Sequence, residues 1–333
     1  MPNTLKTGKT NVMRESDEPQ GLSEIHGYDF NKGVDYEQIL ESFHTTGFQA
    51  TALAKAIDLI KKMREEKCTI YLGYTSNMVT SGLRDVFRFL TQHKMVDVIV
   101  TTAGGVEEDI IKCLGPFLLG DFEASGKELR NKGINRTGNI FVPNSRYCRF
   151  EDFFVPLLKE CADEQKKTGK IITPSEIVDR LGAKINDSDS IYYWAHKNKI
   201  PVFCPAITDG SMGDMVYFFS YERPEFAIDN ARDMRKLNDI TIEAKKTGVI
   251  ILGAGVVKHH ILNTNMMRNG SDYAVYVNTS QEFDGSDAGA RPDEAVSWGK
   301  LLPHSSTVKV FGDATILFPL MVAKCFAQEK GKK

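Results

Sequence analysis

Cys68-Thr-Ile-Tyr-Leu-Gly73 is the stretch of sequence that decides the fold. The helical pattern before it stops here, and a short apolar run that closes on glycine is typical of a buried strand. The polar turn Tyr74-Thr-Ser-Asn-Met-Val-Thr-Ser-Gly82 follows, and a helical pattern then continues to Phe89. A strand, a polar turn and a helix form the unit from which parallel, doubly wound sheets are built.

The same unit recurs along the chain. Residues 96–100 are a second apolar run, which leads into the turn Thr101-Thr-Ala-Gly-Gly-Val-Glu-Glu108 and a helix to Leu114. Later apolar runs come before turns rich in Gly, Asp and Ser, at residues 202–203, 249–252, 273–277 and 308–311. The repetition predicts an α/β fold with a doubly wound, mostly parallel, Rossmann-like sheet and flanking helices.

Three other segments complete the predicted organisation. Helical patterns at residues 36–43 and 50–66 come before the first strand. Residues 120–199 predict a helical insertion packed on the sheet, with helices at 150–166, 174–181 and 189–198. Residues 1–26 are polar and lack a hydrophobic period, so we expect a flexible N-terminal arm. We expect residues 27–333 to form a single domain.

Composition excludes several functional classes. With 42 basic and 44 acidic side chains the net charge is −2, so there is no basic field of the kind that binds nucleic acid. The six cysteines include no C-x-x-C pair, which argues against a zinc site or a disulfide framework. We find neither an apolar leader nor a run long enough to span a bilayer. We therefore expect a cytoplasmic protein that binds neither nucleic acid nor membrane.

An acidic loop follows the apolar run at residues 273–277 and leads into a short helix that starts at Pro292 and ends near Lys300. Five carboxylates gather there, at Glu282, Asp284, Asp287, Asp293 and Glu294. Each one alone is explained by turn chemistry or by the helix dipole. As a group they repel one another, and a cationic ligand would relieve that repulsion.

The glycine turn Gly253-Ala-Gly-Val-Val-Lys258 has two glycines of a dinucleotide fingerprint and Lys in the place of the third. Small residues also allow a helix and a strand to pack closely, so the turn alone fits both interpretations equally. The turns at residues 102–105 and at Ser76-Asn77 offer further backbone N–H groups where phosphate could bind. Together the turns favour a dinucleotide spread over several strand ends.

Other candidate residues each have a simpler alternative. His259 and His260 are adjacent on a predicted helix and point about 100° apart, so they cannot both face one metal. Asp214 fits a helix cap. Trp298 fits core packing, but its ring could also face an alkyl ammonium chain, and a desolvated Lys300 could act as a nucleophile.

Three motifs together resemble the deoxyhypusine synthase family. They are Thr208-Asp-Gly-Ser-Met-Gly-Asp214, Gly255-Val-Val-Lys-His-His260, and Glu282-Phe-Asp-Gly-Ser-Asp-Ala-Gly-Ala-Arg-Pro-Asp-Glu-Ala-Val-Ser-Trp-Gly-Lys300. They occur in the family's order, and the resemblance extends from about Gly27 to the C-terminus. The departures are Ala254, Ser280 and Ala288, where the family more often has Gly, Ala and Ser. None replaces a charged group, so they bear on affinity more than on the reaction.

The resemblance implies a transferase that uses NAD and no metal. It would move the 4-aminobutyl group of spermidine, through an imine on Lys300, to a lysine of the translation factor 5A precursor. The implied catalytic residues are Lys300, His259 and Glu294. The implied substrate-binding residues are Asp214, Asp287, Trp298, Asn263, Glu108, Gly285 and Ser286.

The resemblance also assigns the cofactor and the assembly. NAD would contact Ser76, Asn77, Thr80, Thr102, Ala103, Gly104, Glu108, Asp209, Gly253, Asp284, Thr279, Ser280, Asp313 and Ala314. The protein would be a homotetramer made of two tight dimers, with sites across the dimer interface. The N-terminal arm would cover a neighbouring subunit's active-site entrance.

Three alternative functions remain open from the sequence. Homospermidine synthase is a close relative of this family that uses putrescine as acceptor. A catalytically silent regulatory subunit would have lost the nucleophile, and the presence of Lys300 counts against it. A plain NAD-binding sensor would leave the acidic loop unexplained.

Overall fold

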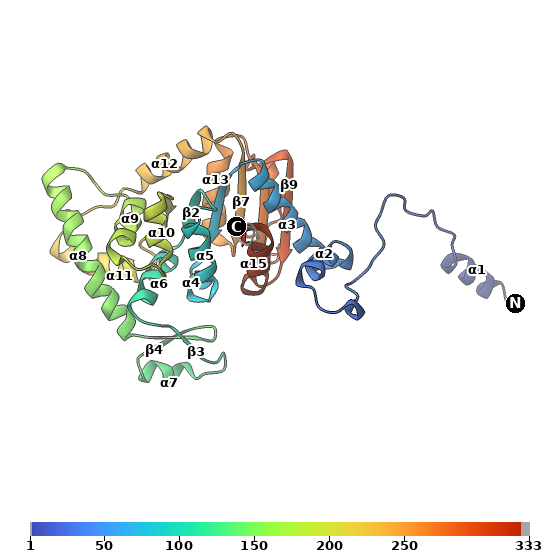
Figure 1. Ribbon diagram of the computed structural model, residues 1–333, viewed down its shortest axis with the longest axis horizontal. Coiled ribbons are helices and arrows are strands. Elements are labelled where there is room, and N and C mark those ends of the chain that lie inside the picture. Colours follow the sequence, from blue (N-terminus) through green and yellow to red (C-terminus); the bar gives the residue numbers. More distant parts are fainter. Residues whose placement is uncertain (1, 328–333) are drawn as a thin grey trace.

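A computed structural model describes residues 2–327 of the chain. A six-stranded parallel sheet forms the centre of the molecule (Figure 1). The strand order is β6-β2-β1-β7-β8-β9. The strands are β1 (Thr69–Tyr74), β2 (Val98–Thr101), β6 (Val202–Phe203), β7 (Thr247–Leu252), β8 (Ser271–Asn278) and β9 (Leu301–Phe311). The chain builds outward from β1 on one side and then from β7 on the other, so the order reverses between β1 and β7. In open α/β sheets ligands bind at the carboxyl ends of the strands at this point.

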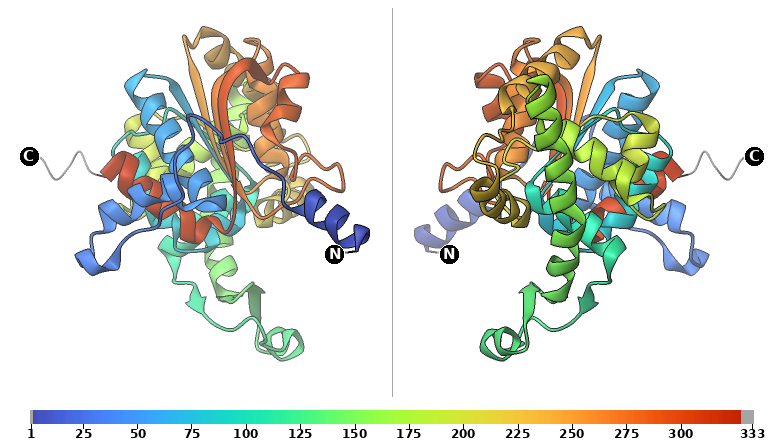
Figure 2. Two further views of the ribbon diagram at one scale, coloured as in Figure 1. Left: turned by 90° about the vertical axis from the view of Figure 1, so that its right-hand side faces the viewer. Right: turned by 90° about the vertical axis from the view of Figure 1, so that its left-hand side faces the viewer.

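Helices cover both faces of the sheet, which confirms the predicted fold class (Figures 1 and 2). Leu72 and its neighbours on one face pack on α3 (Phe48–Glu65), α5 (Leu83–Gln92) and α15 (Ala314–Val322). Tyr71 and the opposite face pack on α12 (Asn230–Glu243), α13 (Gly255–Met266) and α14 (Pro292–Ser297). Burial on both faces explains why the strands read as unbroken apolar runs rather than alternating patterns.

The remaining helices of the body lie around β1, β2 and β6. They are α4 (Ser76–Thr80), α6 (Ala103–Leu114), α8 (Ser145–Thr168), α9 (Pro174–Ile185), α10 (Ile191–Asn198) and α11 (Ser211–Glu222). The three helices predicted for the insertion are therefore present as α8, α9 and α10; α8 and α9 are longer than predicted, and α10 starts two residues later. The described part of the chain ends with η2 (Ala323–Ala327).

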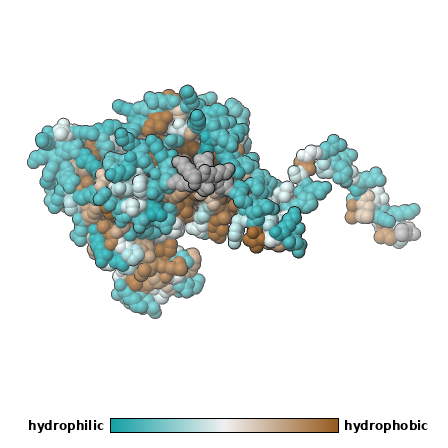
Figure 3. Space-filling model, in the orientation of Figure 1, coloured by the Kyte–Doolittle hydropathy of each residue, from teal (hydrophilic) through white to brown (hydrophobic). Residues whose placement is uncertain are grey.

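A small antiparallel sheet at the start of the insertion was not predicted. It consists of β3 (Leu118–Leu119), β5 (Ile140–Pro143) and β4 (Ile134–Thr137), with α7 (Gly126–Asn131) between β3 and β4. Its strands are too short to give a recognisable period in the sequence. This lobe projects from the body, and apolar side chains lie on its surface (Figures 1 and 3).

The N-terminal residues extend away from the body (Figure 1). They include α1 (Asn3–Val12), which the polar sequence did not predict and which buries none of its side chains. The chain joins the body at His26, whose backbone N–H donates to the Thr45 carbonyl at 3.0 Å, and continues through η1 (Phe30–Lys32) and α2 (Tyr36–Thr46). A flexible arm at 1–26 and a single domain at 27–333 stay predictions, and residues 328–333 lie outside the described part.

None of the helices formed by residues 2–327 has the length and apolar character needed to cross a bilayer.

Candidate functional site

Loops from three adjacent strands meet at the carboxyl edge of the sheet. A Cβ built on Gly104, after β2, would lie 2.7 Å from the Cβ of Ser76, after β1. Gly253, after β7, has φ +82°, and a Cβ there would lie 2.5 Å from the Thr75 hydroxyl. Glycine is therefore required at both positions, and these loops surround the point where the strand order reverses.

Hydrogen bonds continue this edge to the last two strands. The Gly253 N–H donates to the carbonyl of Val277 at 2.9 Å, and the Gly312 N–H donates to the carbonyl of Asn278 at 3.1 Å. The structure therefore brings the predicted cofactor residues after β1, β2, β7, β8 and β9 to one edge.

Helix α6 fixes the position of the short helix α4 through two side chains. The Thr80 hydroxyl donates to the carboxylate of Glu108, and Lys112 donates to the carbonyls of Val79, Thr80 and Ser81 at 2.6, 2.7 and 2.9 Å. Burial raises the pKa of Glu108 to about 7, although the Thr80 hydrogen bond opposes the rise. Burial also lowers the pKa of Lys112 to about 8. The loop that carries Ser76 and Asn77 is thus held by buried charged groups.

The other predicted cofactor residues differ in their hydrogen bonds and in their exposure to solvent. Asp313 caps α15 by accepting the Thr315 N–H at 2.8 Å, and Asp284 accepts the Ser286 N–H at 2.8 Å. Asp313 therefore acts as a helix cap and Asp284 stabilises a turn, as their sequence positions suggest. Asp209 and Thr279 are exposed, Ala103 and Ala314 are buried, and Ser280 is half-buried.

The carboxyl edge fits a dinucleotide. Helices α6 and α13 both begin there without a side-chain cap, so their first backbone N–H groups face the edge with no acceptor side chain from the cap residue. Such N–H groups bind phosphate. The Thr102 hydroxyl is also buried without a hydrogen-bond partner among residues 2–327. A buried hydroxyl of this kind needs a partner, which a bound cofactor would supply.

A second group of residues surrounds the acidic loop. The buried Lys258 ammonium donates to the carbonyls of Asp287 and Ala290, the latter at 3.1 Å, and lies 4.9 Å from the centre of the Tyr276 ring. Burial lowers the pKa of Lys258, and the charge of Asp287 opposes that change. In the described part of the chain, the Tyr276 hydroxyl and Asp287 Oδ2 are buried and unpartnered. A bound ammonium group would satisfy the Asp287 oxygen.

Lys258 and Tyr276 were not predicted as site residues. Tyr276 sits inside an apolar strand, where its hydroxyl gives no signal in the sequence. Lys258 occupies the position of the third glycine in the dinucleotide fingerprint. This departure from the fingerprint was the only feature of the sequence that could have indicated its role.

Lys300 is enclosed whereas its neighbour Trp298 is open to solvent. Lys300 is 8% exposed, Trp298 is 64% exposed, and the Lys300 ammonium lies 5.8 Å from the centre of the Trp298 ring. The alternative that Trp298 is a core residue is therefore wrong. Lys300 and Glu294 both lie close enough to Lys258 for their charges to influence its pKa.

The acidic loop is also tied down within the chain. Arg291 pairs with Glu282 through two hydrogen bonds, one of them 2.7 Å long. Lys309 donates to the carbonyls of Ser280 and Gly289 at 2.7 and 2.6 Å. Part of the predicted repulsion is therefore relieved by the protein's own cations. Gly285 (φ +70°) and Ser286 lie at the exposed tip of the loop.

Asp214 lies away from this second group. It follows β6 and lies near Glu107, whose pKa is raised by burial and, to a smaller extent, by the charge of Asp214. Four strand spacings, roughly 19 Å, separate β6 from β8. Lys300 also precedes Leu301, which pairs with Ser271 at the amino end of β8. One chain therefore divides the predicted residues between a cofactor-side group, with Ser76, Thr102, Glu108 and Asp214, and a lysine-side group, with His259, Asn263, Asp287, Glu294, Trp298 and Lys300.

Comparison with known proteins decides the family. Residues 38–325 match the sequence profile of deoxyhypusine synthase. The chain belongs to the deoxyhypusine synthase family. It is 53% identical over 332 residues to a probable deoxyhypusine synthase of Drosophila melanogaster, covering 93% of this chain and 90% of that protein. It is also 53% identical over 347 residues to the deoxyhypusine synthase of Arabidopsis thaliana, covering 96% and 94%.

A solved structure agrees with this assignment. The crystal structure of a candidate deoxyhypusine synthase from Entamoeba histolytica is 37% identical, with a TM-score of 0.68, and the match covers 91% of this chain and 97% of that one. The resemblance seen in the three motifs is therefore confirmed, and deoxyhypusine synthases are transferases.

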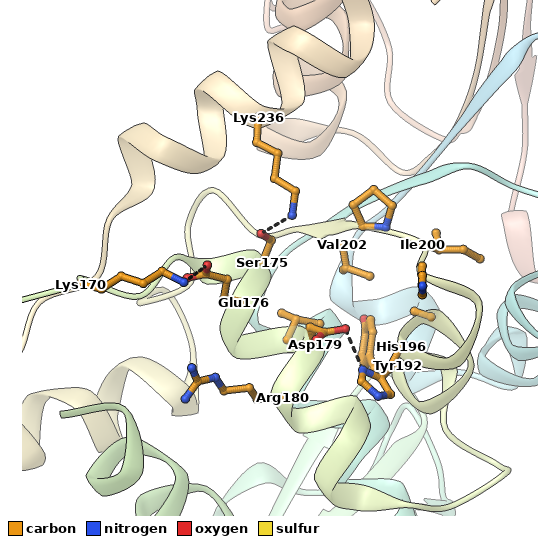
Figure 4. Close-up of a pocket in the computed structure, with 14 residues that line it drawn as sticks. Lys170, Ser175, Glu176, Asp179, Arg180, Tyr192, His196, Ile200, Val202 and Lys236 are labelled. Carbon is orange, nitrogen blue, oxygen red and sulfur yellow. Dashed lines mark hydrogen bonds and ion pairs between the residues drawn. The ribbon is translucent and has the colours of Figure 1, made fainter. Parts of the chain in front are cut away.

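A separate cavity of about 560 Å³ lies at the amino end of β6, between α9, α10 and α12 (Figure 4). Its charged side chains contact each other: Lys170 pairs with Glu176, His196 contacts Asp179 at 2.9 Å, and Lys236 donates to Ser175. The N–H of Ser175 at the start of α9 is already accepted by Asp233 at 2.6 Å. This cavity therefore lies at the amino end of the strands, away from the glycine loops at the carboxyl edge.

Proposed function

We propose that this protein performs deoxyhypusine synthesis, the transfer of the 4-aminobutyl group of spermidine to one lysine of the translation factor 5A precursor. Family membership over nearly the whole chain carries the proposal. At the site, two observations support it: the Lys300 ammonium is enclosed beside the open Trp298 ring, and Asp287 has a buried oxygen without a partner in the described part of the chain.

We assign the chemistry as follows. When bound, NAD would accept hydride from the butyl carbon beside the secondary amine of spermidine and later return it. The amine of Lys300 adds to the resulting carbon–nitrogen double bond, 1,3-diaminopropane leaves, and the butyl group is held as an imine on Lys300. The acceptor lysine then displaces Lys300 to give a new imine, and bound NAD would supply the hydride that converts this imine to a secondary amine. The cycle is balanced and consumes no oxidant.

The substrate-binding and catalytic residues, which come from both groups, have separate roles in this proposal. Asp287 and Asp214 bind the terminal ammonium groups of spermidine, and Trp298 lines the channel with a ring face suited to an alkyl ammonium. His259 and Glu294 move protons at the reacting nitrogens. Asn263 lies one turn beyond His259 and contacts the same substrate, as do Glu108, Gly285 and Ser286.

We assign the NAD site to the carboxyl edge of the sheet. Ser76, Asn77, Thr80 and the Thr102 to Gly104 turn would hold one part of the cofactor, with Glu108 and Asp209 beside them. Gly253, Thr279, Ser280, Asp284, Asp313 and Ala314 would hold the rest. We further propose a cytoplasmic homotetramer of two dimers, with each site shared between two chains.

One experiment separates the candidate acceptors. The purified enzyme is given spermidine and NAD, and then either the translation factor 5A precursor or putrescine. Aminobutyl transfer to the protein lysine supports the proposal, while homospermidine as the main product would identify the alternative acceptor. If a well-folded enzyme forms neither product, the result favours a silent subunit or a sensor. The high identity to deoxyhypusine synthases does not favour these two alternatives.

A further inference from the structure

The cavity between α9, α10 and α12 is lined by more cations than carboxylates (Figure 4). Its volume of about 560 Å³ is in the range of small-molecule sites. Four cationic side chains and two carboxylates line it, at Lys170, Arg180, Lys199, Lys236, Glu176 and Asp179. None of these residues is assigned to spermidine or to NAD, so the proposed function leaves the cavity unused.

Two of these lysines, Lys199 and Lys236, have no acidic partner. Neither ammonium forms an ion pair with a carboxylate of residues 2–327, whereas Lys170 in the same cavity pairs with Glu176 at 2.9 Å. Lys199 is the residue that ends α10, and Lys236 lies on α12, so the two charges come from different helices. The protein therefore holds unneutralised positive charge at this cavity.

Lys236 points from α12 toward α9 (Figure 4). Its ammonium donates to the Ser175 hydroxyl at 3.3 Å and lies 5.7 Å from the centre of the Phe203 ring. Asp233, one turn earlier on α12, uses both carboxylate oxygens on Ser175, in two hydrogen bonds of 2.6 Å. An ammonium has three N–H groups, so Lys236 has donors left for an anion.

Apolar side chains form another part of the lining. Val178, Ile200 and Val202 are buried and face the cavity. The excess of positive charge disfavours a polyamine and favours an anion, and a lysine ammonium is a compact charge that binds phosphate well. Cations beside an apolar surface suit an organic molecule that carries a phosphate group.

Tyr192 connects this cavity to the cofactor edge. Its side chain lines the cavity and is fully buried. Its hydroxyl donates to the Gly105 carbonyl at 2.6 Å and lies 3.2 Å from the Tyr74 hydroxyl at the end of β1. Gly105 directly follows the turn of residues 102–104, which we assign to NAD. A movement of α10 would therefore reach the start of α6 through one buried hydrogen bond.

We propose that this cavity is an effector site for a small phosphorylated metabolite, which changes NAD affinity through Tyr192. The effect on NAD rests on the proposed function, because it requires the cofactor at the carboxyl edge. Binding in the cavity does not depend on that assignment, so the two parts are tested separately.

Calorimetry with inorganic pyrophosphate tests the binding. The full-length protein is first saturated with NAD, which occupies the N–H groups of the carboxyl edge. We expect saturable binding, at least about tenfold weaker in the double variant Lys199→Ala, Lys236→Ala, because charge-assisted hydrogen bonds are lost. The control Lys197→Ala, Arg235→Ala removes exposed cations outside the cavity from the same two helices and should bind like wild type. Absence of saturable binding, or equal binding by the two double variants, overturns the proposal.

Tyr192→Phe tests the link to the cofactor. We expect pyrophosphate to change the NAD affinity of the wild type by about fivefold or more. Tyr192→Phe keeps the ring and should bind pyrophosphate normally, but its NAD affinity should no longer respond. A response that persists in Tyr192→Phe, or in the Lys199, Lys236 double variant, overturns the link, as does an unresponsive wild type. Absence of NAD binding would contradict the proposed function, while the pyrophosphate titrations would still decide whether the cavity is a site.

Discussion

At the scale of single residues, Lys300 shows how burial and reactivity are linked. A lysine at the end of a short helix is a common cap, and its sequence position alone does not make it a nucleophile. In the structure its side chain is enclosed beside Trp298 while the ring itself is open to solvent. We propose that the alkyl chain of the substrate passes along this ring to reach the lysine.

We expect Lys300→Ala to abolish aminobutyl transfer and to leave NAD binding unchanged, because Lys300 is not among the residues assigned to the cofactor. Transfer is measured with labelled spermidine, and NAD binding by calorimetry. Lys246→Ala, which removes an exposed lysine paired with Glu66, is the control and should keep full activity. Transfer by the Lys300 variant at the wild-type rate would remove the covalent step from the proposal.

We expect Asp287→Ala to weaken spermidine binding by about 2–5 kcal/mol while NAD binding stays the same, because a partly buried ammonium would lose its carboxylate. The unpartnered Oδ2 atom is the basis for this expectation. Asp293→Ala removes an exposed carboxylate from the same region and should change neither affinity. Equal losses for spermidine and NAD would point to a folding defect instead.

The stability of the unliganded protein should depend on Glu108. Its pKa rises from 4.5 to about 7 on burial, so between these pH values the folded chain holds a proton that the unfolded chain has released. The free energy of unfolding should therefore fall by roughly 3 kcal/mol as pH rises through this window and then level off. Glu108→Gln keeps a partner for Thr80 and should remove that fall. Urea unfolding at pH 5 and pH 8 measures the difference, and identical pH dependence in both proteins would contradict it.

At the scale of elements, buried side chains rather than loops hold the insertion on the sheet. Asp109 of α6 is fully buried and accepts hydrogen bonds from Arg84 at 2.7 Å, from the Ser190 hydroxyl at 2.6 Å and from the Ile191 N–H at 3.1 Å. One carboxylate thus caps α10 and pairs with a buried guanidinium.

We expect Asp109→Ala to lower the free energy of unfolding by about 3–5 kcal/mol, because Arg84 would be left as an uncompensated buried charge. Glu222→Ala, which breaks an exposed pair with Lys159, should change stability by no more than about 0.5 kcal/mol. Urea titrations of both variants provide the comparison. A similar small effect for both would mean that water or another group reaches Arg84.

The elements also show which parts of the fold a sequence can predict. The strand–turn–helix units and the helices α8, α9 and α10 were recognisable, because each carries a local hydrophobic period over many residues. The lobe of β3, β4 and β5 was missed because two- to four-residue strands have no such period. Tyr276 was not predicted as a site residue, because packing on the sheet, which the sequence does not show, decides which groups lie near its hydroxyl.

At the scale of the whole molecule, the order of the strands decides where the predicted residues lie. The resemblance assigns Asp214 and Lys300 to the same substrate, but the sequence does not give the distance between them. That distance follows from the sheet order, which places β6 and β8 four strand spacings apart. In the proposed homotetramer a second chain would complete the reaction site, and such a shared site would enclose the donor, the cofactor and the acceptor lysine through the whole cycle.

The fate of the transferred hydrogen tests whether the site stays closed in this way. Spermidine that carries deuterium on the butyl carbon beside its secondary amine should transfer that deuterium to NAD, and NAD should return it to the same carbon. The label should then be found in the butylamine group attached to the acceptor lysine, since the proposed cycle has no net redox change. NAD should be required but not consumed. Mass spectrometry of the modified acceptor measures the label. Its loss to solvent, or reduced cofactor accumulating in step with product, would mean that the hydride is not retained and that Lys300 and the acidic loop serve a different reaction.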